Sequence, residues 1–365
     1  MKRVLYPAVI ICGLALSACS KSSDSGSTQS FTSIETDVIN DFVNKTALPQ
    51  YNSLVSAGAT LDNNITTLNT TTTDANLQTA QVSWKAMRQI WERGEGFLIG
   101  PVEGGDYDPN SDTWPTDYHQ MDSLLASSNP LALSDVQSLP QTLRGYHPIE
   151  YLIFGEGGSR KASELDARKK KYLVSLSADL KSIVTALLND WTANPVNYSN
   201  AVMTAGVSGN GTYAKRLDFF LDITGDNGMA GICNEVGQQN EDGKMWHPYL
   251  SKDSSLAESP YSGNSLADFK NNIIGAQQVY LGLGGGKGMK DLVAAKNKAL
   301  DNKIQAAFTS AINSFDNISG SDNMRFEVAI YNRRPAIQAA ATQLNTLQSL
   351  LENDLIDFIQ TNVKD

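Results

Sequence analysis

The sequence has few cysteines, few histidines and no excess of basic residues. Only three of its 365 residues are cysteine, and two of these lie within the first 19 residues, so Cys233 has no intramolecular disulfide partner in the rest of the chain. Lysine and arginine number 29 against 39 aspartate and glutamate, giving a net charge of −10, which argues against a nucleic-acid partner. Hydrophobic residues make up 41%, which is typical of a folded globular chain.

Long hydrophobic runs are also missing. The apolar stretch from Val4 to Ala18 follows two basic residues and is too short to span a bilayer as a stable helix. Residues 1–18 are therefore predicted to be a signal peptide. The sequence Leu-Ser-Ala-Cys that ends at Cys19 resembles a bacterial lipobox, so we expect cleavage before Cys19 and lipidation of its thiol; an ordinary secretory signal is the alternative.

The residues after Cys19 predict a tether. Residues 19–33 are rich in serine, threonine and glycine and have almost no apolar periodicity. Ser20 stands where inner-membrane lipoproteins of the type it resembles carry aspartate, which favours anchoring to the bacterial outer membrane, facing the periplasm or the cell surface. The predicted contact with the membrane is made by the N-terminal lipid alone.

Hydrophobic periodicity predicts an all-α fold. Apolar residues recur every three or four positions over 77–91, 173–191 and 337–358, and no comparable stretch alternates with period two. We expect two packed helical bundles over residues 34–158 and 159–365, divided at the Gly- and Ser-containing break 155–163, with a duplicated four-helix unit as one arrangement.

The segment 143–155 carries the most informative pattern, Gly145-x-His147-x-x-Glu150 within an apolar run. Residues three apart share one face of a helix, so His147 and Glu150 can present an imidazole and a carboxylate to the same ion. In most proteins such a pair is a surface or capping contact. Here the apolar neighbours predict that the pair is buried, and a buried pair needs partners.

Oxygen atoms are expected to complete any metal site, because the chain has only three histidines, His119, His147 and His247. The candidate carboxylates are Glu92, Glu95, Asp117, Glu258 and Asp268. A mixed imidazole and carboxylate set suits iron, manganese and zinc about equally.

Several segments together resemble the imelysin-like family, whose members include an insulin-cleaving membrane protease, iron-regulated bacterial proteins and the periplasmic component of a ferrous-iron uptake system. They are the 143–155 motif, the block from Trp84 to Pro101, the pair Trp114-Pro115 and the block 258–269. The resemblance covers nearly the whole mature chain. It implies a metal site made by His147, Glu150, Glu95 and Glu258, located between the bundles, with Asp268 next in order.

The same resemblance implies the cargo and the role. The expected ligand is a metal ion, with iron favoured and zinc as the alternative, or a small iron-bearing ligand. The expected role is iron uptake, together with an envelope partner protein.

Other residues in these blocks have two interpretations each. Arg88 and Arg144 either orient the site carboxylates or form structural salt bridges. Trp91 and Trp114 either line a pocket or belong to the core. Ser259 and Ser262 either cap the helix that follows or donate hydrogen bonds into the site, since no base stands near them for a catalytic triad.

Two further functions stay open at this point. A metallopeptidase would use His147 as a ligand and Glu150 as a ligand or general base. However, the chain lacks His-Glu-x-x-His, and Tyr151 stands where the inverted zinc motif has its second histidine. A third function is an envelope scaffold in which His147 and Glu150 form a structural contact. The glycine run 282–288 does not match a phosphate loop and predicts a turn between helices.

Overall fold

The computed structural model describes residues 29–116 and 118–364. Within these residues the regular elements are helices, which confirms the predicted all-α class. No described helix combines the length and apolar character that a membrane crossing needs. The predicted signal peptide, Cys19 and the predicted tether up to residue 28 lie outside the described residues.

The first bundle is built around three long helices, α2 (Leu48–Thr70), α3 (Asp74–Gly94) and α9 (Ala167–Thr192), with the shorter α8 (Tyr146–Phe154) packed against α3 and α9. Their buried faces follow the periodicity that predicted them. In α3, Leu77, Trp84 and Met87 are buried, and the Thr73 side chain caps the first turn by accepting a hydrogen bond from the backbone N–H of Asn76.

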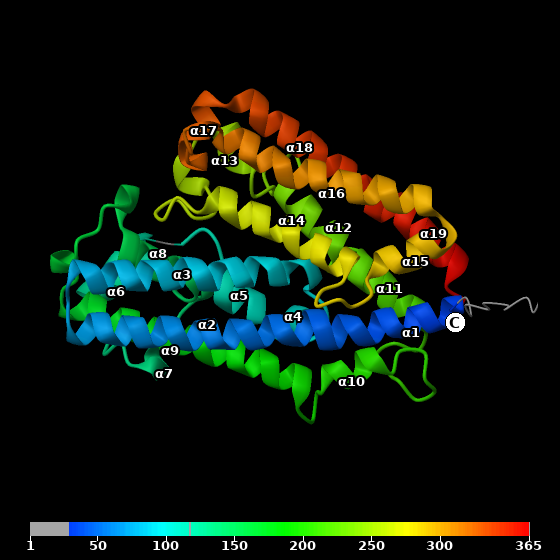
Figure 1. Ribbon diagram of the computed structural model, residues 1–365. Helices are drawn as coiled ribbons and strands as arrows, with labels where there is room; N and C mark the ends of the chain where they lie inside the picture. Colours follow the sequence, from blue (N-terminus) through cyan, green and yellow to red (C-terminus); the bar gives the residue numbers. More distant parts are fainter. Residues whose placement is uncertain (1–28, 117, 365) are drawn as a thin grey trace, which may run out of the picture.

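The second bundle is formed by α12 (Met229–Gly237), α14 (Ser265–Leu281), α16 (Lys298–Ser319) and α18 (Arg334–Ser349). Figure 1 shows this group in yellow-green to red beside the blue, cyan and green helices of the first bundle. The glycine run 282–288 joins α14 to α15 (Met289–Lys296), as its turn chemistry predicts.

The bundles do not divide at residue 158. Helix α9 packs along the length of α2 and thus belongs to the first bundle, although the expected second domain began at residue 159. The apolar stripe of α9 predicts that it packs against other helices but does not predict which ones. The next helix, α10 (Tyr198–Met203), still packs against α9 and against α1 (Phe31–Asp41), so the chain passes to the other bundle only after Met203.

The last three residues of the predicted tether, 31–33, are already helical. Helix α1 (Phe31–Asp41) starts after Ser30, whose side chain accepts a hydrogen bond from the backbone N–H of Ser33. The Phe31 ring packs edge-on against Phe358, with 6.5 Å between ring centroids, so contact with a distant helix orders this start. The C-terminal end consequently lies beside α1 in Figure 1.

Shorter helices connect and cover the bundles. They are α4 (Pro101–Gly104), α5 (Tyr107–Asp112), α6 (Tyr118–Ala126), α7 (Leu133–Val136), α10 (Tyr198–Met203), α11 (Arg216–Thr224), α13 (Trp246–Ser251), α17 (Phe326–Asn332) and α19 (Ile356–Asn362). π-Helical turns at Phe42–Ala47 and Leu350–Leu355 link α1 to α2 and α18 to α19. Helix α5 lies outside the stretches in which apolar periodicity predicted helices.

Glycines allow the two bundles to meet backbone to backbone. A Cβ on Gly96, just after α3, would lie 2.5 Å from the backbone nitrogen of Ala276 on α14. A Cβ on Gly275 would lie 2.1 Å from the carbonyl oxygen of Arg93. Any larger residue at either position would push α3 and α14 apart.

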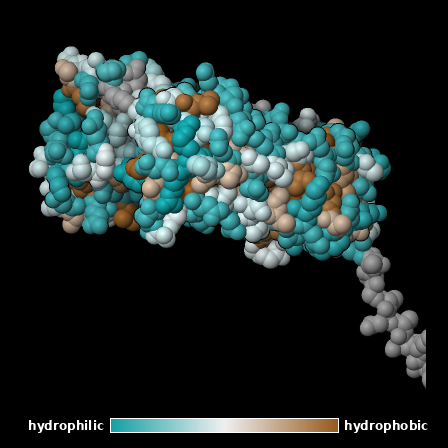
Figure 2. All heavy atoms as spheres, turned by 90° about the horizontal axis from the view of Figure 1, so that it is seen from above, coloured by the Kyte–Doolittle hydropathy of each residue, from teal (hydrophilic) through white to brown (hydrophobic). Residues whose placement is uncertain are grey.

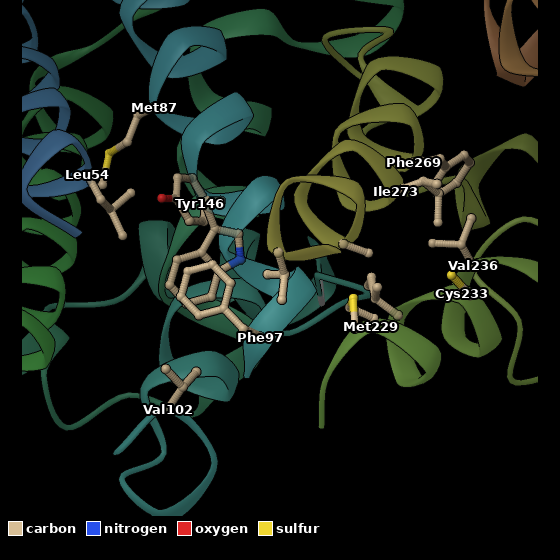
Figure 3. Packing of buried hydrophobic residues seen from close by; sticks show 14 of the residues in the cluster. Leu54, Met87, Phe97, Val102, Tyr146, Met229, Cys233, Val236, Phe269 and Ile273 are labelled. Carbon is tan, nitrogen blue, oxygen red and sulfur yellow. The ribbon is translucent and has the colours of Figure 1, made fainter. Parts of the chain in front are cut away.

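Apolar side chains fill both bundles. Figure 3 shows Leu54, Met87, Phe97 and Tyr146 on one side and Phe269, Ile273, Val236 and Cys233 on the other, and all of them belong to a continuous buried core. On the face drawn in Figure 2, hydrophilic residues predominate and hydrophobic ones form separate patches.

Candidate metal centre

A buried arginine lies where the two bundles meet. Arg88 on α3 is fully buried, and its guanidinium lies over the Tyr146 ring at 5.1 Å. Its Nη2 lies 2.5 Å from Glu92 Oε1 and 2.6 Å from Glu258 Oε1. Its Nη1 pairs with Asp112, and its Nε lies 3.8 Å from Asp268 Oδ1. One cation therefore joins carboxylates from α3, α5, α14 and the loop that precedes α14.

A tryptophan and an asparagine hold the neighbouring carboxylates. Trp91 Nε1 donates hydrogen bonds to Glu95 Oε1 at 2.9 Å and to Asp112 Oδ2 at 2.8 Å. Asn272 Nδ2 on α14 donates to Glu92 Oε2 at 2.5 Å and to Glu95 Oε2 at 2.8 Å. These neutral donors fix the carboxylates without cancelling their charge.

Asp112 reaches the cluster because α8 begins close to the end of α5. Gly145 precedes α8 with a φ of 79°, and a Cβ there would lie 2.0 Å from the carbonyl oxygen of Ser111. Glycine both adopts this backbone conformation and permits the contact. This is the physical role of the glycine in the Gly-x-His-x-x-Glu pattern.

The two ring nitrogens of His147 face different carboxylates. Nε2 lies 3.0 Å from Asp112 Oδ1 and 3.9 Å from Glu258 Oε1, while Nδ1 lies 3.6 Å from Glu150 Oε2. Glu150 Oε1 accepts hydrogen bonds from the backbone N–H and the hydroxyl of Ser262, both at 2.7 Å. The Trp114 ring packs on the imidazole, with 4.8 Å between centroids.

Three of these side chains present ligand atoms to one point. One atom each from Asp112, His147 and Glu258 lie within 4.8 Å of one another, and a second group of Glu92, Glu95 and Asp112 meets the same criterion. Glu150 contributes no atom to either group. The sequence predicted His147 and Glu150 as joint ligands; the geometry instead places Glu150 on the Nδ1 side of the ring, where a carboxylate can orient the imidazole.

Negative charge exceeds permanent positive charge in this cluster. Six carboxyl groups, those of Glu92, Glu95, Asp112, Glu150, Glu258 and Asp268, face the cations Arg88 and Lys244 and the imidazole of His147. Such an excess in a buried place requires protons or a further cation. Mixed carboxylate and imidazole donors fit a transition-metal ion.

The pKa values follow from this surplus. Burial raises the pKa of Glu92 and Glu95 well above their usual range, and in Glu95 repulsion from Glu92 adds to this effect. Burial opposes ionisation of Asp112, but Arg88 and His147 outweigh it and hold the pKa of Asp112 well below its usual range. Burial lowers the pKa of His147, yet hydrogen bonding to Asp112 and Glu150 raises it overall to about 9.

A cavity of about 320 Å³ opens onto the ligand set. Asp112, Glu258, Trp114 and Lys244 line it together with Asp108 and with three acidic residues nearer the solvent, namely Glu235, Glu241 and Asp242. The negative charge of its wall attracts cations, and Asp112 and Glu258, two of the three converging residues, lie in that wall.

The remaining predicted residues lie in different places. Arg144 binds Asp179 of α9 through two nitrogens, at 2.9 and 3.1 Å, so it forms a structural salt bridge and does not orient the cluster. Ser262 donates into the site, whereas the backbone N–H of Ser259 bonds to Ser265 Oγ and neither serine caps α14. Asp117 lies outside the described residues.

Other histidines do not join the converging ligands within the described residues. His247 lines the same cavity as Asp112, but His119 lines a separate cavity with Tyr151 and Arg325. The single imidazole of the converging set is that of His147.

Sequence reasoning missed Asp112, Lys244 and Asn272. Asp112 lies two residues before the Trp114-Pro115 pair, in an acidic stretch, and this was the only local signal for it. Lys244 lies in a turn between α12 and α13, and Asn272 lies one helical turn after Asp268. Lys244 contacts Glu95 across 149 positions of sequence, and Asn272 contacts Glu92 across 180.

Comparison with known proteins now adds to this geometry. Residues 47–351 match the family model for imelysin. The chain belongs to the imelysin family. The imelysin match begins at the start of α2 and ends after α18, so it includes both bundles and every residue of the cluster.

Three proteins are similar to this chain, and two of them have solved structures with the same fold. The iron-regulated protein A of Synechococcus elongatus is 27% identical over 259 residues, which cover 70% of this chain and 67% of that protein. A crystal structure described as an iron-regulated protein A precursor from Parabacteroides distasonis is 25% identical, with a TM-score of 0.74 over 90% of this chain and 97% of its own. An imelysin-like protein from Psychrobacter arcticum has the same fold at 13% identity, with a TM-score of 0.69 over 92% and 98% of the two chains.

Proposed function

We propose that the protein binds a metal ion, with iron favoured, at Asp112, His147 and Glu258. The observation that carries this proposal is the convergence of three ligand atoms within 4.8 Å at the end of an acidic cavity. The similarity to iron-regulated protein A of Synechococcus elongatus supports iron over zinc or manganese. A small iron-bearing ligand that presents its metal through the cavity is the alternative cargo.

The ligand roles follow from the geometry. His147 Nε2 would ligate with one oxygen each from Asp112 and Glu258, and Glu150 would hold the Nδ1 side of the ring. Trp91 and Ser262 would restrain Asp112 and Glu150 through their hydrogen bonds. Such a rigid carboxylate-rich set favours capture of a cation.

We further propose a place for this capture in the bacterial envelope. The lipobox-like sequence at Cys19 and the tether after it support a protein attached by lipid to the outer membrane, with the bundles beyond the tether. In this setting the protein would collect iron and release it to an uptake partner in the envelope.

The geometry favours binding over peptide hydrolysis. A zinc peptidase normally presents two histidines and a carboxylate together with a separate glutamate that activates water. The converging set in the described residues has one imidazole, and Glu150 Oε1 is already engaged by two hydrogen bonds from Ser262. The metallopeptidase and scaffold functions stay as the alternatives that the experiment below separates.

The test is a metal titration of the chain from Ser20 onward with Fe(II) under anaerobic conditions, Fe(III), Zn(II) and Mn(II). We expect about one Fe(II) per chain. His147→Gln should weaken the affinity by more than about tenfold. Substitution of residues that only support a metal ligand already lowers metal affinity by about that factor, and His147 is proposed as a ligand itself. The matched control is His119→Gln, the same substitution at an exposed histidine outside the ligand set, which should bind as the wild type does.

Each other outcome has a definite meaning. If His147→Gln is folded and binds Fe(II) as tightly as the wild type, the proposed site is wrong. If neither protein binds any of the four ions, the scaffold function is favoured. If the Zn(II)-loaded wild type cleaves a peptide library and Glu150→Gln does not, the peptidase function replaces simple binding.

A further inference from the structure

A lysine ammonium lies inside the acidic cavity, among the carboxylates of the cluster. Lys244 lies in the turn between α12 and α13 (Trp246–Ser251). Its Nζ lies 3.0 Å from Glu235 Oε1, 3.4 Å from Glu95 Oε2 and 3.6 Å from Glu258 Oε1. The ammonium thus has three oxygen neighbours from three different carboxylates, as a bound cation would.

This position conflicts with a metal ion on the proposed ligands. Glu258 Oε1 is shared by Lys244 and by the ligand set, because it also lies 3.9 Å from His147 Nε2. Arg88 Nη2 already contacts this oxygen at 2.6 Å, so a metal ion would be a third positive charge there, and it would be repelled strongly in a partly buried place. Either the metal binds weakly or the ammonium moves away.

Lys244 has room to move, whereas Arg88 does not. Arg88 is fully buried and does not line the cavity, but the Lys244 side chain is 18% exposed and forms part of the cavity wall. Its backbone N–H is anchored by a 2.9 Å hydrogen bond to the carbonyl of Glu235. The flexible four-carbon stem can therefore swing while the backbone stays in place.

New partners for the ammonium lie along the same wall. Glu235 is already in contact and is 41% exposed, and the exposed Glu241 and Asp242 line the cavity nearer the solvent. A short outward movement exchanges Glu95 and Glu258 for these residues. The lysine charge then stays paired, Glu95 loses its ammonium neighbour, and Glu258 keeps Arg88 as its remaining cation.

We infer that Lys244 is a tethered competitor of the metal. Its ammonium neutralises Glu95 and Glu258 in the metal-free protein and moves to the acidic mouth of the cavity when the metal enters. This inference rests on the proposed metal-binding function. It assigns to Lys244 the role of limiting affinity, so that bound metal can be released again.

Two measurements test the inference. The first is the Fe(II) dissociation constant of Lys244→Met, which keeps a long unbranched side chain but lacks the charge. We expect it to be at least about tenfold lower than that of the wild type. The matched control is Lys171→Met on the exposed side of α9, which should stay within about twofold of the wild type.

The second measurement needs no variant. Reductive methylation of the wild-type protein, with each lysine followed by mass spectrometry, reports how accessible the Lys244 amine is. We expect Lys244 to be modified slowly in the metal-free protein and at least about fivefold faster when Fe(II) is bound under anaerobic conditions. The rate at Lys171 should not change.

The outcomes separate the inference from the proposed function. If the wild type shows no Fe(II) binding that depends on His147, both fail together. If that binding is present but Lys244→Met binds no more tightly, Lys244 positions the carboxylates and the inference is wrong while the site stands. Tighter binding by Lys244→Met with an unchanged methylation rate would reflect charge alone and would also overturn the displacement.

Discussion

The two sides of α14 are both buried, but they are held by opposite chemistry. Asp268 and Asn272, one turn apart, face α3 and its charged cluster. Phe269 and Ile273, the next residue in each case, are buried in the core of the second bundle, near Val236 and Cys233 in Figure 3. One helix therefore contributes to an apolar core and to a polar site with hardly any exposed surface between them.

This contrast shows why burial alone does not define a core. On the apolar side, stability comes from area removed from water and from close packing, which need no partner of defined charge. On the polar side, each group depends on another, because an ion left unpaired in the interior is costly. The two sides should respond differently to substitution.

The largest effect is expected for Arg88→Met. Removing the central cation leaves Glu92, Asp112 and Glu258 without their shared partner, and breaking a buried ion pair from one side typically costs about 3–5 kcal/mol. Urea denaturation at pH 8 measures this loss. Arg333→Met, which removes a partly exposed pair with Asp322, should cost less than about 1 kcal/mol. Equal losses in the two variants would contradict the central role of Arg88.

A smaller but clear loss is expected for Ile273→Ala on the apolar side of α14. The side chain is fully buried, so the substitution removes apolar contact and leaves a cavity, at about 3 kcal/mol. The loss should be the same at pH 5 and pH 8, because no charge is involved. Fe(II) affinity of the folded variant should not change, and a marked change would show that the two sides of α14 are coupled.

The smallest effect, and the one that depends on pH, is expected for Asp268→Asn. Burial, opposed by Arg88, raises the pKa of Asp268 to about 7, above its value in the unfolded chain. The folded state thus favours the protonated carboxyl, and the stability that this group contributes below pH 4 is lost as pH rises through 7.

Asp268→Asn cannot ionise and should therefore escape this loss. Relative to the wild type, the variant should gain roughly 2–3 kcal/mol in the free energy of unfolding between pH 5 and pH 8. Urea denaturation at the two pH values measures the difference. No difference between the two pH values would mean that Asp268 is ionised throughout this range in the folded protein.

The sequence predicted much of the local structure. Apolar periodicity predicted the long helices that became α3, α9 and the C-terminal α18 to α19 segment, because a helix buries one stripe wherever it packs. It did not predict that α9 packs on α2, since an apolar stripe has no information about its partner. Nor did it predict α5, whose six residues are too few to show a period.

For the site, the sequence indicated residues but not their arrangement. The pattern Gly145-x-His147-x-x-Glu150 and the block around Glu258 pointed to residues that the structure places within one cluster. The assignment of Glu150 as a ligand beside His147 followed from helical spacing and from the family resemblance, whereas a site role and a structural salt bridge were both open for Arg144. The structure instead turns Glu150 to the rear of the imidazole and pairs Arg144 with Asp179.

By itself, then, the sequence determined the all-α class, the family and the buried character of the His147 segment, because these follow from periodicity, motif and local composition. Tertiary structure alone decided that Asp112 and Glu258, 146 positions apart, meet at His147, and that Lys244 lies among their neighbours. The reason is physical. Helix periodicity is a property of adjacent turns of one segment, whereas the partner of a buried charge is whichever distant group the folded chain brings close enough to neutralise it.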